Sequence, residues 1–592
     1  MQYQAPVRDT MFVLSEIVGF DLFSQADPSF DLDPDAAEAI LEQAGRFAAE
    51  VLEPINGSGD REGCTWQGGV VTTPTGFKEA FERYRADGWP TLIAPVENGG
   101  QGLPRTIWLA VEEYAVAANL SFACYNVLSV GAATTLLASA SEELKAAYLP
   151  KLVTGEWSGT MNLTEPHCGT DLGLIRTIGT RREDGTYSVS GTKIFITAGE
   201  HDLTENIVHL VLAKTTGGPD NVRGLSLFLV PKFLPDAAGN AGERNGVACG
   251  SIEHKMGLKG SATCVMNYDD ATGFLVGEEC NGLAAMFVMV NMARLHVGMQ
   301  GLGLADAAYQ HAVAYARERR QGRAPTGASN PEHKADRLIV HPDVRRMLLE
   351  CRALIEGSRA LCLWTIAQVD RGERGPDAQE RAQARDFVSL LTPVVKGFVT
   401  DISYRCTTLS QQVFGGHGFI NEIGAEQFVR DSRITKLYEG ANGIQALDLA
   451  ARKVAMRDGE TMRAFLAMVR EEANTGRATF PDLAQKLDRL AADAEKSTSW
   501  LSKHMTRDPN ATAAGAYSYM ELVGYLALGW LWLRMAVAAH RHLDAGEDVD
   551  YHRVKIATAR FYFDRLVPEA MTLRERIEGG AGSIMALAEE DF

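Results

Sequence analysis

The chain has 592 residues, of which 46% are hydrophobic and 23% are charged. That length is too great for one hydrophobic core, and the composition is that of a soluble globular protein, so we expect roughly two to four domains. The formal net charge of −18 argues against nucleic acid as the main partner, because phosphate binding requires a basic face. The nine cysteines form no CxxC pair, which favours a reduced cytosol over a disulfide framework and predicts no metal site.

We expect no signal peptide and no membrane span. Arg8 and Asp9 stand where a signal peptide would carry an apolar run. The longest apolar stretch, Leu522–Leu533, has 12 residues between Glu521 and Arg534, and a span requires about 20. We therefore predict a buried helix there and a cytoplasmic protein.

Helical patterns dominate from Asp33 to Ala140. Residues 33–55 open with Asp-Pro and repeat apolar side chains at a helical spacing, and two further helical patterns follow. The pattern changes near Gly155, where short β-branched runs bounded by Gly, Asp and Pro predict strands joined by turns. These runs are residues 185–197, 205–215 and 224–231.

Helical periodicity returns near Gly282 and persists to the end of the chain, interrupted by a Pro- and Gly-containing insert at residues 324–342. A partial GxG match at Gly301 and Gly303 lies inside a helical pattern, where we do not expect it to bind phosphate. Strands and helices do not alternate, which excludes a doubly wound dinucleotide-binding fold. We predict a mainly α protein with a central β domain, divided into residues 1–158, 159–280, 281–455 and 456–592.

The loop Asn162–Gly173, NLTEPHCGTDLG, precedes the predicted strands. Its small residues would let backbone N–H groups approach an anion or a ring edge, and its hydroxyls add donors. Taken alone, it fits a solvated turn equally well. Further along, Phe195 and Thr197 stand two positions apart in a predicted strand and would point to the same face. Taken alone, a core phenylalanine and a hydrogen-bonded threonine explain them.

Two later motifs have both an ordinary and a functional interpretation, and a third contains an isolated acid. Arg319, in ARERRQG, stands at a helix end, where it either compensates the helix dipole in solvent or clamps a phosphate. The segment Gln412–Gly418 is either a helix stop or a close nucleotide contact. In KLYEGANGIQ, Glu439 is a carboxylate among small residues, and Lys436 is the nearest basic residue in the sequence.

The order and spacing of these motifs together resemble the acyl-CoA dehydrogenase family. The resemblance covers Phe30 to Val454. Because the chain also has the insert at residues 324–342 and an additional helical block at residues 456–592, it most resembles the large members of the family. This resemblance implies a helical N-terminal domain, a β-barrel-like middle domain, a four-helix bundle and an extra C-terminal helical domain. The matching segments are LTEPHCGTD, KIFIT, EHKMGLKGSATC, ARERRQG, QVFGGHGF and RDSRITKLYEGANGIQ.

The resemblance implies an FAD cofactor between the β domain and the bundle, held by two groups of residues. One group would meet the pyrimidine edge, the pyrophosphate and the ring of the flavin nucleotide. The other would reach the FAD of a neighbouring subunit, and because large members carry their extension where smaller ones place a second dimer, we expect a homodimer. The first group is Leu163, Thr164, Gly169, Thr170, Phe195 and Thr197, and the second is Arg319, Gln412 and Gly416.

By the same resemblance, Glu439 is the catalytic base. The implied reaction removes a proton from Cα and a hydride from Cβ of an acyl-CoA thioester, giving a trans-2-enoyl-CoA, with flavin N5 taking the hydride. A carboxylate in water, with a pKa of about 4.3, is too weak a base, so we expect burial to raise this pKa. Tyr438 would line the acyl pocket. Asn291 and Arg294 match positions near the CoA arm, and a buried structural ion pair explains Arg294 equally well.

Some positions depart from the family pattern. Phe195 stands where many relatives carry Trp, Ala441 and Gly443 replace longer polar side chains, and Gly322 replaces the usual Phe of an inter-subunit contact. The similarity favours a short or sulfur-containing acyl group, such as 3-(methylthio)propionyl-CoA, or a short-to-medium acyl-CoA. The expected electron acceptor is a soluble electron-transfer flavoprotein.

Two alternatives keep the same fold. A family-like flavoprotein without dehydrogenase activity would act in alkylation defence or DNA binding and would carry a basic C-terminal helical face, but this chain is acidic and retains Glu439. A flavin oxidase would use O₂ or a nitroalkane, and there an Asp commonly replaces the Glu.

Overall fold

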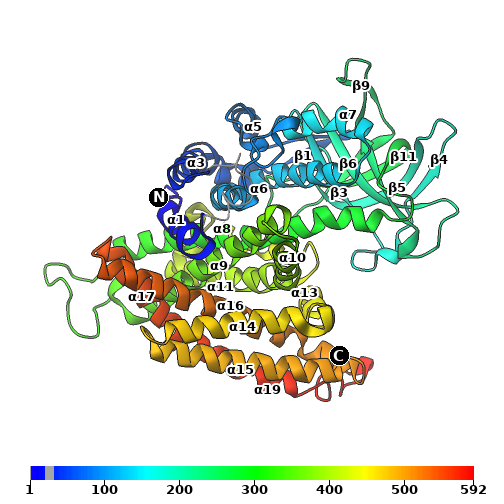
Figure 1. Cartoon of the computed structure of the whole chain (residues 1–592). Coiled ribbons are helices and arrows are strands. Elements are labelled where there is room, and N and C mark those ends of the chain that lie inside the picture. The colour runs from blue at the N-terminus through cyan, green and yellow to red at the C-terminus, as the bar shows by residue number, and fades with distance from the viewer. Residues whose placement is uncertain (1, 21–31) are drawn as a thin grey trace. The chain divides into compact units, whose positions relative to one another are not determined.

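The computed structural model describes residues 2–20 and 32–592 (Figure 1). The chain divides into two compact units. The β unit comprises Arg46–Leu103 and Ala118–His296, and the helical unit comprises Met1–Gly45, Pro104–Ala117 and Val297–Phe592. Along the chain the elements run from helices to strands and back to helices, as the sequence predicts.

Five strands of the β unit close into a ring. β11 (Thr263–Val276) pairs with β5 (Tyr187–Thr197), and the circuit continues through β4 (Ile178–Arg181) and β6 (Asn206–Thr215) to β7 (Leu225–Pro231), which pairs again with β11. Apolar side chains of these strands form one buried cluster. The closed circuit confirms the barrel-like middle domain, an architecture that removes exposed sheet edges.

Shorter strands and helices complete the β unit. β3 (Trp157–Asn162) extends the ring beside β6, and β10 (Val247–Ile252) extends it beside β11. Two small antiparallel pairs are β1 (Thr65–Gln67) with β2 (Val70–Thr72) and β8 (Phe233–Pro235) with β9 (Ala241–Arg244). The helices and turns are η2 (Ala48–Leu52), η3 (Glu53–Ile55), α4 (Asn56–Glu62), α5 (Phe77–Ala86), η4 (Trp89–Thr91), η5 (Val96–Asn98), α7 (Glu142–Val153), η6 (Leu172–Leu174) and η7 (Val222–Gly224).

Glycines allow close helix packing in the helical unit. A Cβ atom at Gly298 of α8 (Gly282–Glu318) would lie 2.5 Å from Val395 Cγ1 of η9 (Val394–Val399), and one at Gly303 would lie 2.8 Å from the backbone oxygen of Glu113 in α6 (Arg105–Ser139). A methyl group does not fit at such separations. Gly301 and Gly303 both lie within α8, so the prediction that the partial GxG match is part of a helix is confirmed.

The C-terminal helices pack on the remainder of the helical unit. The long helices α14 (Glu460–Gly476), α15 (Pro481–His504) and α16 (Pro509–Asp544) lie side by side (Figure 1). α16 also packs against α9 (Pro342–Arg374) and η9. The other elements of the unit are α1 (Val7–Val13), η1 (Leu14–Val18), α3 (Pro34–Phe47), η8 (Leu338–Val340), α10 (Ala378–Pro393), α11 (Thr400–Val413), η10 (Gly415–Phe419), η11 (Asn421–Ile423), α12 (Ala425–Thr435), α13 (Asn442–Asp448), η12 (Leu449–Lys453), η13 (Met456–Gly459), α17 (Val549–Phe561), η14 (Tyr562–Leu566), α18 (Val567–Ala570), α19 (Leu573–Glu578) and η15 (Glu589–Asp591).

Three helices of the described chain are long and apolar enough, by length and composition, to cross a membrane: α6, α8 and α16. The expectation based on the stretch Leu522–Leu533 underestimated this, because α16 continues well beyond that stretch on both sides. Most of the apolar window in each helix is nevertheless covered by the protein itself, 89% of it in α16. The prediction of a buried helix is confirmed, and its apolar surface is explained by packing.

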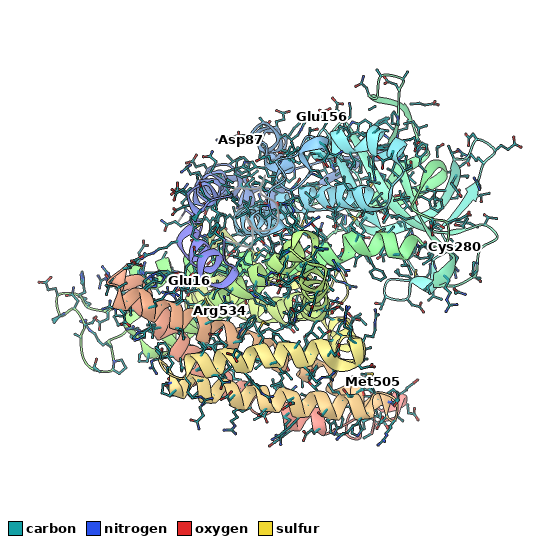
Figure 2. The ribbon with its side chains drawn as sticks, viewed as in Figure 1. Glu16, Asp87, Glu156, Cys280, Met505 and Arg534 are labelled. Carbon is teal, nitrogen blue, oxygen red and sulfur yellow. The ribbon has the colours of Figure 1, made fainter. Side chains whose placement is uncertain are left out.

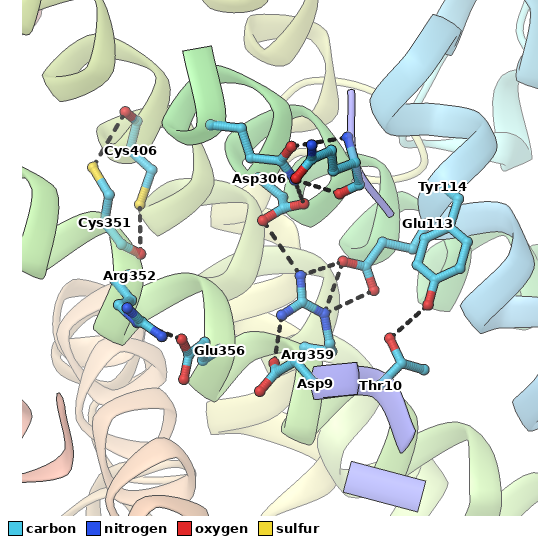
Figure 3. Close-up of polar contacts among 12 residues, drawn as sticks. Asp9, Thr10, Glu113, Tyr114, Asp306, Cys351, Arg352, Glu356, Arg359 and Cys406 are labelled. Carbon is cyan, nitrogen blue, oxygen red and sulfur yellow. Dashed lines mark hydrogen bonds and ion pairs between the residues drawn. The ribbon is translucent and has the colours of Figure 1, made fainter. Parts of the chain in front are cut away.

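A buried arginine organises the core of the helical unit (Figure 3). Arg359 of α9 places its guanidinium 2.6 Å from Asp9 Oδ2, 2.7 Å from Glu113 Oε1 and 3.5 Å from Asp306 Oδ1. Burial raises the pKa of the Asp306 carboxyl to about 7, although Arg359 opposes the shift. The N-terminal helix α1, which carries Asp9, is thus bonded to a helix some 350 positions away in the chain.

The N-terminal segment also bonds to the C-terminal helices. Lys555 of α17 donates to Asp9 and to Glu356, and its side chain is fully buried. Glu16, at the end of this segment (Figure 2), accepts hydrogen bonds from Arg541 and His542 of α16. Charge pairs therefore fasten residues 7–18 to both the bundle and the extra helices.

The insert at residues 324–342 folds around one acid. The buried Asp336 carboxylate accepts hydrogen bonds from the backbone N–H groups of Ala324, Ser329 and Asn330 and from the Ser329 hydroxyl. These bonds hold the pKa of Asp336 well below its usual range. A short bridge between Arg320 and Arg337 closes the base of the loop.

Candidate active site

Glu439 lies in the turn between α12 and α13 with an unusual backbone. Its φ angle is +54°, in the left-handed region that non-glycine residues rarely adopt, and Gly440 follows at +86°. Such a conformation costs a residue with a side chain roughly 1–2 kcal/mol. The Gln445 side-chain amide donates to the backbone carbonyls of Glu439 at 3.2 Å and Gly440 at 3.4 Å. Gln445 is buried, so this bond fixes the turn from within the fold.

The neighbours of Glu439 are also held in place. Tyr438 donates its hydroxyl to the buried Gln300 amide oxygen of α8. The Asn442 backbone N–H donates to the Lys436 carbonyl at 3.1 Å, which closes the turn across its base. Glu439 itself is half-buried. A carboxylate in this position is accessible to a small reactant while its backbone is immobilised.

A buried ion pair holds the loop predicted to bind the pyrophosphate. Lys193 Nζ lies 2.9 Å from Glu165 Oε1 and donates to the Leu163 carbonyl at 2.9 Å. The Glu165 carboxylate also accepts from the backbone N–H groups of Arg176 and Thr177 and from the Thr177 hydroxyl. Glu165 and Lys193 belong to two separate sequence motifs, LTEPHCGTD and KIFIT, and the structure shows them as one unit.

Phe195 occupies a β-bulge. The pairing of β5 with β11 skips from Ile196 opposite Cys264 to Lys193 opposite Met266, so β5 carries one extra residue here. Phe195 takes a left-handed φ of +59°, and the residue is 58% exposed. The bulge interrupts the two-residue period of β5 between Lys193 and Ile196, and the shared face of Phe195 and Thr197 stays a prediction.

Four of the predicted cofactor residues come together in the β unit. The Thr164 carbonyl accepts from the Ile194 N–H at 2.9 Å, which places the loop beside the bulge that carries Phe195. A Cβ atom at Gly169 would lie 3.8 Å from Thr164 Cγ2. The Lys193 bond to the Leu163 carbonyl brings that residue to the same place. Thr170 is exposed and Thr197 half-buried.

A second group comes together in the helical unit. The Tyr315 ring stacks on Phe414 with centroids 4.4 Å apart, and its hydroxyl lies 2.8 Å from His417 Nδ1. This joins the end of α8, where Arg319 is exposed, to the exposed glycine turn that follows Gln412. Neither Gly415 nor Gly416 has a heavy atom within 4 Å of where a Cβ would stand. The turn is therefore open to a ligand or to another chain.

The predicted substrate residues differ in exposure. Asn291 is exposed and Arg294 half-buried on the part of α8 that belongs to the β unit, whereas Tyr438 belongs to the helical unit.

Among the described residues, Glu165, His167 and Cys168 are close enough to share a metal ion. Because Lys193 and Thr177 already bond to the Glu165 carboxylate, we do not propose a metal site there.

Four family models match successive parts of the chain. The acyl-CoA dehydrogenase N-terminal, middle and C-terminal domains match residues 34–156, 160–271 and 281–454, and the acetyl-CoA dehydrogenase C-terminal-like domain matches residues 460–588. A relative from Ruegeria pomeroyi, named 3-methylmercaptopropionyl-CoA dehydrogenase, is 44% identical over 99% of both chains. This chain belongs to the acyl-CoA dehydrogenase family.

Other members of the family are similar over the same length. The broad-specificity linear acyl-CoA dehydrogenase FadE5 of Mycobacterium tuberculosis is 34% identical over the full length of both chains. The solved structure of an acyl-CoA dehydrogenase complexed with FAD from Bacillus anthracis covers 96% of this chain and 91% of its own, with a TM-score of 0.75 at 20% identity. The acyl-CoA dehydrogenase fold, including the extra C-terminal domain, is therefore present.

Proposed function

We propose that this acyl-CoA dehydrogenase uses FAD to desaturate an acyl-CoA thioester, with Glu439 as the base that removes the α-proton. The observation that carries the proposal is the strained left-handed backbone of Glu439, held by the buried Gln445 amide. Backbone strain that surrounding bonds maintain is concentrated at functional sites. The proposal is also supported by the match of residues 281–454, which contain this turn, to the family's C-terminal domain.

In the proposed reaction, the Glu439 carboxylate takes the proton from Cα as the Cα–H bond breaks. The electron pair left on Cα forms the Cα–Cβ double bond when the Cβ–H bond is lost. FAD, when bound, supplies the two-electron acceptor for the β-hydrogen, which leaves as hydride. The Glu439 backbone N–H would donate to the thioester oxygen and so stabilise the negative charge that develops there. Tyr438 would line the pocket that holds the acyl chain.

The residues present fit an FAD nucleotide. The half-exposed Phe195 ring offers a flat aromatic face, and Thr164 and Thr170 add hydroxyl donors beside the open surface of Gly169. The loop that carries them is fixed by the Glu165–Lys193 ion pair, so it needs little ordering on binding. Leu163 and Thr197 would complete this group, and the exposed Arg319, with Gln412 and Gly416, would contact the cofactor of a second subunit.

We further propose the substrate class, the assembly and the domain boundaries. The 44% identity to the Ruegeria enzyme favours 3-(methylthio)propionyl-CoA or a short-to-medium acyl-CoA as the substrate. Asn291 and Arg294 would lie near the CoA arm. An electron-transfer flavoprotein would be the electron acceptor. A homodimer is supported by Phe419, a residue 85% exposed beside the open glycine turn. We also propose a cytoplasmic location. The domains would be residues 1–158, 159–280, 281–455 and 456–592, close to the ranges that the family models match.

The test is spectroscopic. The purified protein should be yellow, and anaerobic 3-(methylthio)propionyl-CoA should bleach the flavin band and yield an enoyl-CoA. Slow reoxidation by air together with fast reoxidation by an electron-transfer flavoprotein separates a dehydrogenase from a flavin oxidase. A protein that binds flavin, fails to bleach with any member of an acyl-CoA panel and binds DNA instead would contradict the proposal.

A further inference from the structure

One carboxylate of the helical unit receives bonds from three directions. Asp401 lies in the first turn of α11, where Lys436 Nζ is 2.7 Å from Oδ1 and the Asn442 side-chain amide donates to Oδ1 at 3.1 Å. The Tyr517 hydroxyl donates to the other oxygen, Oδ2, at 2.5 Å. Asp401 therefore connects two residues of one turn to a third residue on a different helix.

The two residues bonded to Oδ1 flank Glu439. Lys436 comes three positions before it and Asn442 three positions after it. Asn442 is buried, and its side chain also accepts from Lys396 Nζ at 2.8 Å and donates to the Gly397 carbonyl at 2.9 Å, both in η9. Both ends of the Glu439 turn are thus anchored to the start of α11, and the Asn442 end is anchored to η9 as well.

The third residue belongs to the C-terminal extension, defined here as residues 460–588, which a separate family model matches. Tyr517 stands on α16. This helix approaches η9 closely, because a Cβ atom at Gly397 would lie 2.3 Å from Met520 Sδ and one at Gly524 would lie 2.2 Å from Phe398 Cγ. The glycines stand on opposite sides of the same contact, so the two surfaces fit each other and admit no added methyl group on either side.

We propose that the C-terminal extension positions the catalytic base, with Tyr517 acting through Asp401 on the turn that carries Glu439. The inference rests on the proposed function of Glu439. Tyr517 is a positioning residue, since its hydroxyl bonds to Asp401 and not to Glu439. Proton abstraction requires a carboxylate whose position relative to the Cα–H bond is held to within a fraction of an ångström, so releasing one anchor of the turn slows that step before it weakens binding.

The test compares two tyrosines of α16. Tyr517→Phe removes only the hydroxyl that bonds to Asp401. Tyr519→Phe is the matched control, because the buried Tyr519 hydroxyl lies 2.7 Å from Thr498 Oγ1 in α15 and makes its bond within the extension. The readouts are kcat, KM, the flavin spectrum, the Tm and the primary isotope effect with α-deuterated 3-(methylthio)propionyl-CoA.

We expect Tyr517→Phe to lower kcat roughly tenfold and to increase the isotope effect, with KM and the flavin spectrum unchanged. Tyr519→Phe should keep the wild-type kcat and lower the Tm. In the Asp401→Ala background, Tyr517→Phe should have no further effect, since the bond it removes is already lost. Equal kcat values and isotope effects for Tyr517→Phe and Tyr519→Phe would overturn the inference and leave the proposed function standing. A wild-type protein without acyl-CoA turnover would overturn both.

Discussion

Lys193 Nζ and Glu165 Oε1 lie 2.9 Å apart, and neither side chain has more than 2% of its surface exposed. Burial by itself would raise the pKa of Glu165, but Lys193 and the hydrogen bonds from Thr177 and Arg176 hold it below its usual value. Burial lowers the pKa of Lys193 in spite of its partner. The pair joins the Leu163–Thr170 loop to β5, so two segments of the proposed cofactor site depend on one charge contact.

Lys193→Met should destabilise the protein by about 3–5 kcal/mol, because the Glu165 carboxylate would remain buried without its cation. Urea unfolding followed by circular dichroism measures the loss. The double variant Lys193→Met/Glu165→Leu should recover part of it, since both charges are then absent. A single variant within about 1 kcal/mol of wild type would show that the pair is not a structural requirement.

Arg359→Met should also destabilise by about 3–5 kcal/mol, since it removes the buried cation that contacts Asp9, Glu113 and Asp306. The control is Arg553→Met, whose ion pair with Asp550 at 3.0 Å is exposed on both sides. We expect that variant to change the free energy of unfolding by less than about 1 kcal/mol. Similar losses in both variants would contradict the role given to the buried cluster.

Stability should fall as the pH rises from about 4 to 7 through Asp306. Its folded pKa of about 7 lies above the ordinary value of 3.8 because the carboxyl is buried, so in this interval the folded state holds a proton that the unfolded state has lost. The stabilising contribution of Asp306 is complete below pH 3.8, and it declines by about 1.4 kcal/mol per pH unit between pH 3.8 and about 7. The free energy of unfolding of wild type and of Asp306→Asn, measured at several pH values, isolates the contribution of Asp306, because the amide does not titrate. Parallel curves for the two proteins would refute this assignment.

Glu439→Gln should retain the flavin spectrum and the fold while losing turnover by roughly 10²- to 10⁴-fold, because an amide cannot accept the α-proton. Single-turnover bleaching by acyl-CoA measures the chemical step directly. Glu422→Gln serves as control, since Glu422 is an exposed acid of η11 outside the turn. Near-normal bleaching in Glu439→Gln would remove this residue from the mechanism.

Phe195→Ala should weaken FAD retention by roughly tenfold, the loss expected for one aromatic stacking contact. Phe195→Trp should retain the cofactor, because many relatives are expected to carry Trp at this position. Flavin released on dilution, followed by fluorescence, gives the comparison. Equal retention in Phe195→Ala and wild type would place the ring outside the cofactor site.

The sequence by itself determined the order of helices and strands, the buried character of Leu522–Leu533 and the motifs that resemble the family. These signals are local, since apolar periodicity and turn residues act within a few positions of one another. The bulge at Phe195 was not predicted, because a shift in pairing with β11 leaves no mark on the spacing within β5 alone.

Only the tertiary structure decided which charged and polar residues meet. Arg359 finds Asp9 across 350 positions of chain, and Tyr517 finds Asp401 across 116. Each of these side chains taken alone is an ordinary polar residue on a helix, and many pairings between such residues are compatible with the same periodicity. The partner is chosen by how the helices pack, because a buried charge is tolerated only where packing brings an opposite charge or a donor within hydrogen-bonding distance.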